Sequence, residues 1–202
     1  KGADIITETQ VLRGYVLGFE DRFTVLEPEE RFNAENARAV RVIDAEGLIV
    51  APGLIDVHIH GSGGRDTMEG TIDALNTISR TIVKNGTTSF LAATMTMDIK
   101  TVSAALDQVR NAVRLGTPGA QLLGAHMEGP FINPGYKGAQ DADNITLPDW
   151  SWIEPFIDVI RIVTLAPELP GAKELIRKLR EHGIIASMGH TAATYEEAVE
   201  GI

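Results

Sequence analysis

The chain has 202 residues, 44% hydrophobic and 23% charged, a balance typical of one or two globular domains that excludes disordered and collagen-like chains. A formal net charge of -10 argues against a nucleic-acid-binding surface or a basic membrane-binding patch. Cysteine is absent, which excludes disulfide scaffolds, cysteine-ligated zinc and thiol catalysis, and neither a signal segment nor a membrane-spanning apolar run is evident, so we expect a cytoplasmic enzyme.

Residues 1–52 predict a small β subdomain. Aliphatic and β-branched residues gather in three runs that we expect to form short strands, over residues 7–17, 21–26 and 39–44. Turn signals separate these runs at Gly14, Pro28 and Glu46-Gly47. At Ala51-Pro52-Gly53 the pattern changes, and strand and helix patterns begin to alternate. We therefore place a domain boundary between residues 52 and 53.

Residues 53–202 predict alternating strands and helices. Strand-like runs begin at residues 54, 87, 120, 159 and 184. Helical spacing of apolar residues covers 71–84, 98–115 and 172–182, and a capping box of Thr194 and Glu197 opens a further helix. Buried strands joined by helices predict a parallel sheet. Two topologies remain open: a doubly wound sheet, or the first part of a (β/α)₈ barrel, which needs eight strands.

The strand that begins at residue 54 carries polar side chains on one face. Alternation places on that face Leu54, Asp56, His58 and His60. The other face, which we expect to pack under helices, carries Ile55, Val57 and Ile59. Two imidazoles two residues apart can chelate one metal ion, although such pairs also occur without one. Their position at a strand end, just before a glycine-rich turn, is where parallel-strand enzymes place their sites.

Two further strand ends carry residues of the same chemistry. Glu128 ends the third strand, just before Gly129-Pro130, and His190 follows the fifth. Because the carboxyl ends of parallel strands meet at one edge, we expect His58, His60, Glu128 and His190 to converge. A buried carboxylate needs a partner, and a cation is the partner that we favour over a backbone amide. This ligand set suits one or two divalent ions such as Zn²⁺, Fe²⁺ or Mn²⁺.

Other polar residues near these strand ends have weaker signals. His126 lies one position deeper than Glu128, so we expect it to support the ligands or to form a core hydrogen bond. His182, in a last helical turn, has a structural interpretation. Glu168 fits a site residue and a loop hydrogen bond equally well. The long loop over residues 131–145 suggests a lid or substrate contacts, and its Lys137 either attracts an anionic substrate or is solvated.

Residues 44–61 resemble the entry to the barrel in the amidohydrolase superfamily. Four further segments are similar to one family within it, the N-acetylglucosamine-6-phosphate deacetylases: residues 124–132, 137–140, 165–168 and 189–195. The resemblance runs from about residue 40 to the end of the chain. Its most specific part is Glu128-Gly129-Pro130-Phe131.

The resemblance implies an α/β fold, the (β/α)₈ TIM barrel of metal-dependent hydrolases with a small N-terminal β-sandwich subdomain. Residues 53–202 would form the first part of that barrel, truncated after the fifth strand. The implied reaction belongs to amino-sugar catabolism: a metal-activated hydroxide hydrolyses the acetamide of N-acetylglucosamine 6-phosphate and releases acetate and glucosamine 6-phosphate. The implied partners are this small-molecule sugar phosphate and a second copy in a homodimer, with no nucleic acid and no membrane.

By position, the resemblance makes His58 and His60 ligands of one metal ion, Glu128 a carboxylate that can bridge two ions, and His190 a ligand of the second. No lysine occurs between Lys137 and Lys173, which fits Glu128 in the bridging role that a carboxylated lysine takes in other amidohydrolases. Ala139 and Gln140 match substrate-binding positions, although some members carry histidine at the latter. The general acid, an aspartate, is expected beyond Ile202.

Several alternatives stay open at this point. The chain could act as another metal-dependent amidohydrolase, on a cyclic amide or on a different acetamido sugar phosphate. It could instead be an inactive truncated fragment that binds a structural metal, and a chain of these 202 residues by themselves is expected to be inactive and to leave two sheet edges open. A nucleotide-binding fold is disfavoured because Gly61-Ser62-Gly63-Gly64 matches neither the dinucleotide fingerprint nor the phosphate loop.

Overall fold

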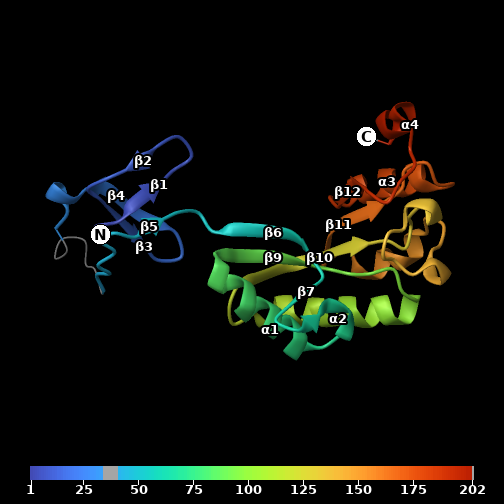
Figure 1. The fold of residues 1–202 in the computed structure, drawn as a ribbon, viewed down its shortest axis with the longest axis horizontal. Coiled ribbons are helices and arrows are strands. Elements are labelled where there is room, and N and C mark those ends of the chain that lie inside the picture. The colour runs from blue at the N-terminus through green and yellow to red at the C-terminus, as the bar shows by residue number, and fades with distance from the viewer. Residues whose placement is uncertain (34–40, 202) are drawn as a thin grey trace. The chain divides into compact units, whose positions relative to one another are not determined.

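The computed structural model describes residues 1–33 and 41–201. The chain divides into two compact units, Lys1–Gly53 and Leu54–Ile202, which are described separately. Their strands and helices are labelled along the chain in Figure 1. Within the described residues, every helix is too short or too polar to cross a lipid bilayer.

The described part of the first unit is built from short strands. These are β1 (Asp4–Ile6), β2 (Val11–Leu12), β3 (Tyr15–Phe19), β4 (Phe23–Pro28) and β5 (Ile49–Val50). Strand β1 lies between β2, which is antiparallel to it, and β5, which is parallel. Strands β3 and β4 form a separate antiparallel hairpin. The small N-terminal β domain is thereby confirmed.

Two of the strands predicted in this unit are wrong in detail. The run over residues 7–17 is divided, because Gly14 adopts a left-handed φ of 67° and turns the chain between β2 and β3. Of the run over 39–44, residues 39 and 40 lie outside the described part, and 41–44 form no strand. The segment instead meets the first residue, since Ala45 N–H donates to the Lys1 carbonyl (2.8 Å) and the Lys1 amino group to the Ile43 carbonyl (2.8 Å).

The second unit contains a parallel five-stranded sheet. Its members are β6 (Leu54–Ile59), β9 (Thr87–Ala93), β10 (Gln121–Glu128), β11 (Ile160–Leu165) and β12 (Ile185–Met188). These are the five predicted strands. They lie in the order β12-β11-β10-β9-β6, so each strand pairs with its neighbours in sequence. A doubly wound sheet reverses its order at a switch point, whereas a barrel does not, so the order is that of a half-barrel.

The predicted helices are also confirmed. They are α1 (Ile72–Ile82), α2 (Ile99–Leu115), α3 (Ala172–Glu181) and α4 (Tyr195–Glu200). Figure 1 shows α1 and α2 beside β9 and β10, and α3 beside β11 and β12. The capping box at the start of α4 is formed, with the Thr194 hydroxyl accepting from Glu197 N–H and the Glu197 carboxylate from Thr194 N–H. Between β10 and β11 the chain forms only 3-10 turns: Pro134–Tyr136, Ala142–Asn144, Trp150–Trp152 and Glu154–Phe156.

The turn after β6 is short and tight. It holds the hairpin of β7 (Gly61–Ser62) and β8 (Arg65–Asp66), followed by the 3-10 turn Thr67–Glu69. Gly61 has to be glycine, because a Cβ there would lie 2.1 Å from the Arg65 carbonyl oxygen. The chain can therefore leave the end of β6 sharply, directly after His60.

The hydrophobic core of this unit lies between the sheet and the helices. The largest fully buried side chains come from both layers and include Leu75, Ile78, Phe90, Leu106, Met127, Leu165 and Leu179. The helical residues among them stand three or four positions apart from other buried side chains, as the amphipathic spacing requires. Packing of this face holds the strand ends in fixed positions.

The aliphatic face of β6 departs from expectation. Ile59 packs against the core, but Ile55 is 61% exposed and Val57 49% exposed. Strand β6 stands at the edge of the described sheet and pairs within it only with β9, which leaves these two side chains exposed. The prediction that all three residues pack under helices is therefore wrong for two of them.

A buried serine connects α1 to the start of β10. The Ser79 hydroxyl donates to the Ala120 carbonyl (2.7 Å) and accepts from Gly119 N–H (2.9 Å), while Ala120 N–H donates to the Ser79 carbonyl (3.1 Å). Ser79 and Ala120 are both fully buried. The hydroxyl thus satisfies Gly119 N–H and shares the Ala120 carbonyl with the Thr117 hydroxyl, which also donates to it (2.7 Å).

We expect Ser79→Ala to lower the free energy of unfolding by about 1–3 kcal/mol, because Gly119 N–H loses its partner and the buried Ala120 carbonyl keeps only the Thr117 hydroxyl. Thr77→Ala on the same helix is the matched control, since its hydroxyl bonds only to the Asp73 carbonyl within α1. Urea unfolding of both variants measures the difference. Equal destabilisation by the two substitutions would contradict this assignment.

An ion pair ties α2 to the turn before β11. Arg110 donates from Nε to Asp158 Oδ2 (2.7 Å) and from Nη2 to Asp158 Oδ1 (2.7 Å), and its guanidinium lies 4.9 Å from the centre of the Phe156 ring. This two-bond geometry is the strong form of an arginine–carboxylate pair. The hydrogen bonds from Arg110 hold the pKa of the Asp158 carboxyl below its ordinary value of 3.8.

A carboxyl whose pKa is lowered on folding stabilises the protein above its ordinary pKa and loses that contribution as the pH falls through the lowered value. We therefore expect Asp158→Asn to lower the melting temperature at neutral pH, and the gap to the parent protein to close below pH 3.8. Thermal unfolding followed by circular dichroism, from neutral pH to below pH 3.8, measures the difference in melting temperature. Asp107→Asn, which removes a single bond to the same guanidinium, should have the smaller effect. A gap that does not change with pH would refute the prediction.

Candidate metal centre

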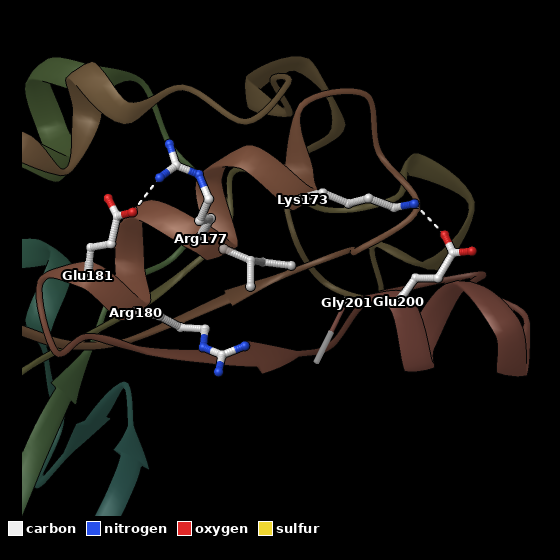
Figure 2. A pocket seen from close by; sticks show the side chains of 7 residues that line it. Lys173, Arg177, Arg180, Glu181, Glu200 and Gly201 are labelled. Carbon is white, nitrogen blue, oxygen red and sulfur yellow. Dashed lines mark hydrogen bonds and ion pairs between the residues drawn. The ribbon is translucent and has the colours of Figure 1, made fainter.

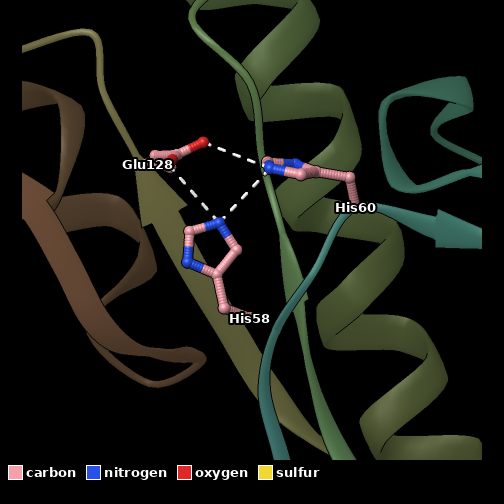
Figure 3. A group of neighbouring side chains, drawn as sticks. All are labelled: His58, His60 and Glu128. Carbon is pink, nitrogen blue, oxygen red and sulfur yellow. Dashed lines mark hydrogen bonds and ion pairs between the residues drawn. The ribbon is translucent and has the colours of Figure 1, made fainter. Parts of the chain in front are cut away.

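Three imidazoles surround one carboxylate at the carboxyl-terminal edge of the sheet. The Glu128 carboxylate lies 3.4 Å from His58 Nε2 through Oε1 and 3.2 Å from His60 Nε2 through Oε2. The two Nε2 atoms lie 3.3 Å apart, and Figure 3 shows both rings turned toward the carboxylate. On the side of β12, His190 Nε2 lies 3.1 Å from Glu128 Oε1. The three histidines predicted as ligands therefore lie around the fourth predicted residue, Glu128.

The carboxylate is buried and charged. Glu128 is only 6% exposed, and its Oε2 also accepts a hydrogen bond of 2.6 Å from Gln140 Nε2. Burial by itself would raise the pKa of the Glu128 carboxyl, but the His60, His58 and His190 imidazoles outweigh it and lower the pKa to about 2. The hydrogen bond between His60 and Glu128 raises the pKa of the His60 imidazole. Glu128 is therefore a carboxylate at neutral pH, and within the described residues its ion-pair partners are the three histidines.

His190 reaches the cluster through an unusual backbone conformation. Its φ is 50°, in the left-handed region that residues with a Cβ seldom occupy. Gly189 before it packs against Thr164 so closely that a Cβ would lie 2.6 Å from the threonine methyl. The His190 Nδ1 donates to the Tyr136 carbonyl (2.8 Å), because a carbonyl can only accept. The other ring nitrogen, Nε2, is therefore the one turned toward Glu128.

The spacing of the donor atoms fits a divalent ion. Zinc bonds to imidazole nitrogen and carboxylate oxygen are about 2.0–2.2 Å long, so two ligand atoms of a tetrahedral ion lie about 3.3–3.6 Å apart. The His58 and His60 nitrogens lie 3.3 Å apart, and each is near a different oxygen of Glu128, His58 Nε2 at 3.4 Å from Oε1 and His60 Nε2 at 3.2 Å from Oε2. Together these residues offer one ligand atom each within 4.8 Å of one another. Two imidazole nitrogens and a carboxylate oxygen are also the donor types that zinc and its neighbours prefer.

His126 lies beneath the cluster and is not one of its donors. Its Nδ1 donates to the Val57 carbonyl (2.8 Å), and its Nε2 lies 2.7 Å from the Thr164 hydroxyl. Burial lowers the pKa of His126, so the ring is neutral and Nε2 accepts the Thr164 proton. Both nitrogens are occupied within the protein. The ring also lies 4.5 Å, centre to centre, from His58 in an edge-to-face contact, so it supports a ligand from below.

Gln140 makes a contact that the sequence did not reveal. Besides donating to Glu128, its amide accepts Thr96 N–H through Oε1 (2.7 Å), so both ends are used within the protein. Gln140 is buried, whereas Ala139 beside it is exposed. Lys137 donates to the Gln140 carbonyl (3.1 Å), so it holds the loop. No local pattern could have revealed the contact between Gln140 and Glu128, since it crosses a loop of irregular structure.

Two other predicted polar positions are resolved by their contacts. His182, which follows α3, donates from Nδ1 to the Lys178 carbonyl (2.9 Å) and lies 4.8 Å from the Trp150 ring, as the structural interpretation requires. Glu168, which follows β11, accepts hydrogen bonds from three neighbouring loop groups. Of the two roles left open for Glu168, the loop hydrogen bond is the one observed.

A surface pocket of about 370 Å³ lies away from this cluster, between α3 and α4. Figure 2 shows that charged side chains on its rim are matched in pairs: Lys173 bonds to Glu200, and Arg177 to Glu181. Arg177 also bonds to Glu174 (2.7 Å). Because these charges already have partners, the pocket offers no convergent set of groups to a ligand, and we assign no site to it.

Comparison with known proteins gives this geometry a context. The model of the amidohydrolase family matches residues 49–202. An N-acetylglucosamine-6-phosphate deacetylase of Bacillus subtilis (strain 168) is 38% identical over 200 residues, which cover 96% of this chain and 50% of the relative. The chain thus spans about half the length of the curated relatives it matches.

Solved structures agree with the sequence matches. The N-acetylglucosamine-6-phosphate deacetylase of Pasteurella multocida aligns with a TM-score of 0.83 and 28% identity, over 99% of this chain and 52% of that one. A mutant of the Mycobacterium smegmatis deacetylase, solved in complex with N-acetyl-D-glucosamine-6-phosphate, aligns with a TM-score of 0.79 and 25% identity, over 98% of this chain and 51% of that one. The resemblance inferred from the motifs is confirmed. With its family match, its half-barrel and its cluster of histidines and a glutamate at the strand ends, this chain belongs to the amidohydrolase family.

Proposed function

We propose that the protein hydrolyses the acetamide of N-acetylglucosamine 6-phosphate to glucosamine 6-phosphate and acetate. The observation that carries the proposal is the clustering of His58, His60 and Glu128 at a spacing that could hold a metal ion. The relatives of the chain are named N-acetylglucosamine-6-phosphate deacetylases. Those relatives are about twice as long, so the proposal concerns the intact protein. We expect the general acid, an aspartate, to lie beyond Ile202.

We assign His58 and His60 to one divalent ion, His190 to a second, and Glu128 to both. When bound, such an ion lowers the pKa of water and polarises a carbonyl oxygen, which makes amide hydrolysis feasible at neutral pH. The chain's own residues prepare the site. The charge on Glu128 offsets that of a cation, the Gln140 amide orients Oε2, and the Tyr136 carbonyl fixes which His190 nitrogen faces inward.

The substrate-binding positions Ala139 and Gln140 remain part of the proposal. They belong to a loop that passes over the cluster, since a Cβ at Gly138 would lie 3.6 Å from the His190 ring. The Gln140 side chain is already committed to Glu128 and to the Thr96 backbone. We therefore assign it an indirect role through the carboxylate, and assign direct sugar contact to the exposed backbone around Ala139.

We further propose a cytoplasmic location and a homodimer. The location is supported by the chemistry of the substrate, because a sugar phosphate carries charge that keeps it from crossing a lipid bilayer. The identity of the metal is left to measurement, since histidine and glutamate bind several divalent ions.

Removing a ligand should abolish tight metal binding. We expect His58→Asn and His60→Asn in the intact protein to weaken zinc binding by more than the roughly 10- to 100-fold that loss of a supporting residue causes. His182→Asn is the matched control, because this histidine bonds to its own helix, away from the cluster. Calorimetric titration of the metal-free proteins measures the affinities. Unchanged zinc affinity in both ligand variants would refute the assignment.

The proposed activity is tested by acetate release from N-acetylglucosamine 6-phosphate. We expect a chelator to abolish it, zinc to restore it, and Glu128→Gln to lower kcat/KM by about 100-fold or more, the equivalent of roughly 2.7 kcal/mol. Residues 1–202 assayed by themselves should release no acetate. If the metal-bound intact protein leaves this substrate untouched but cleaves a cyclic amide, the proposed reaction is wrong and the cyclic-amide activity takes its place. A tightly bound metal without any hydrolysis would indicate a structural site.

A further inference from the structure

The Glu168 carboxylate connects loops that follow three different strands. Its Oε1 accepts Asn133 Nδ2–H (2.9 Å), from the loop after β10, and Ala192 N–H (2.7 Å), from the loop after β12. Its Oε2 accepts the Thr191 hydroxyl (2.5 Å). Glu168 itself follows β11. One side chain therefore holds three neighbouring loops at the edge of the sheet where the histidine–carboxylate cluster lies.

These bonds hold the backbone of His190 from both sides. Thr191 and Ala192, the two residues after His190, are the ones held by Glu168. On the other side, Asn133 N–H donates to the His190 carbonyl (2.9 Å) while the Asn133 side chain donates to Glu168. The ring of His190 then bonds to Tyr136, three residues after Asn133. Tyr136 is joined to this set through Asn133, since Tyr136 N–H donates to the Asn133 carbonyl (2.9 Å).

His190 needs such support because of its backbone. A left-handed φ in a residue with a Cβ persists only when the surrounding contacts enforce it. The carboxylate is suited to this task, since burial would raise the pKa of Glu168 but the bonds from Thr191, Ala192 and Asn133 outweigh burial and lower it. An ionised carboxylate only accepts hydrogen bonds, and all three of its neighbours are donors.

We infer that Glu168 is a positioning residue for His190, whose left-handed backbone it enforces so that the imidazole Nε2 faces Glu128. This inference rests on the proposed function, in which His190 binds the second metal ion. Glu168 acts through hydrogen-bond acceptance and not through contact with substrate or metal. A neutral acceptor of the same shape should therefore replace it, whereas truncation should not.

The test uses Glu168→Ala and Glu168→Gln in the intact protein, with Glu174→Ala as the matched control, an exposed glutamate that bonds only to Arg177 on its own helix. The first readout is made without metal: the NMR signal of the His190 Nδ1 proton, assigned with His190→Ala and slowed in exchange by the Tyr136 carbonyl. The second readout is a zinc titration that resolves the two sites.

We expect Glu168→Ala to lose the slowed His190 signal and to weaken the second zinc by about 10- to 100-fold while leaving the first unchanged. Glu168→Gln should retain both, because its oxygen can accept from Ala192 and Asn133 and its amide can donate to Thr191. Glu174→Ala should match the parent protein. A folded Glu168→Ala with an unchanged His190 signal would overturn the inference.

Two further outcomes are separated by the design. If the parent protein binds no zinc, the proposed function fails, but the metal-free His190 signal still decides the role of Glu168. If Glu168→Ala does not fold, Thr191→Val takes its place, since it removes one of the three donors. A weakened His190 signal in that variant supports the inference, and a full signal overturns it.

Discussion

The buried negative charge of Glu128 is the constraint on which the rest of the site depends. A carboxylate removed from water is costly unless positive or hydrogen-bonding partners compensate for it. Here the partners are three imidazoles and the Gln140 amide, all within hydrogen-bonding or ion-pair distance. The partners come from three segments, so compensating this one charge requires the ends of β6 and β12 and the loop after β10 to meet.

The sheet makes that meeting possible because all of its strands run in the same direction. In a sheet whose order follows the sequence, the carboxyl-terminal ends form one continuous edge, and the loops that follow the strands are neighbours in space as they are in the chain. The loop after β10 is long and lacks an α-helix, so it can fold over this edge and bring both Gln140 and Tyr136 to the cluster. The clustered residues thus lie at or just after strand ends, and the irregular loop orients them.

The clustered histidines are supported from two directions. From below, the neutral His126 ring bonds to the Val57 carbonyl next to His58 and to Thr164 on β11, at a point where the pairing of β6 with β9 is irregular. From the loop side, Glu168 holds the backbone that follows His190. Both supports are polar groups whose bonding capacity is used within the protein, a requirement for a precise polar site in a low-dielectric interior.

The sequence by itself determined the strands and helices of the second unit and the strand-end histidines and glutamate that cluster there. Periodicity and caps located the five parallel strands and four helices, and alternation within β6 put His58 and His60 on one face, because these signals depend only on residues close together in the chain. The position of Glu128 and His190 at strand ends followed in the same way. Motif resemblance added the family and the barrel, which periodicity left open against a doubly wound sheet.

Only the tertiary structure decided how these pieces meet. Contacts between residues far apart in the chain decide the strand order and the pairing of β5 with β1. They also decide the exposure of Ile55 and Val57 on the edge strand. The Gln140 bond to Glu128 and the three bonds to Glu168 depend on such contacts too, and no local pattern encodes them. A hydrogen bond between a loop amide and a strand-end carboxylate depends on the path of the whole loop. Local sequence therefore places the histidines and the glutamate at the strand ends, and long-range packing orients them.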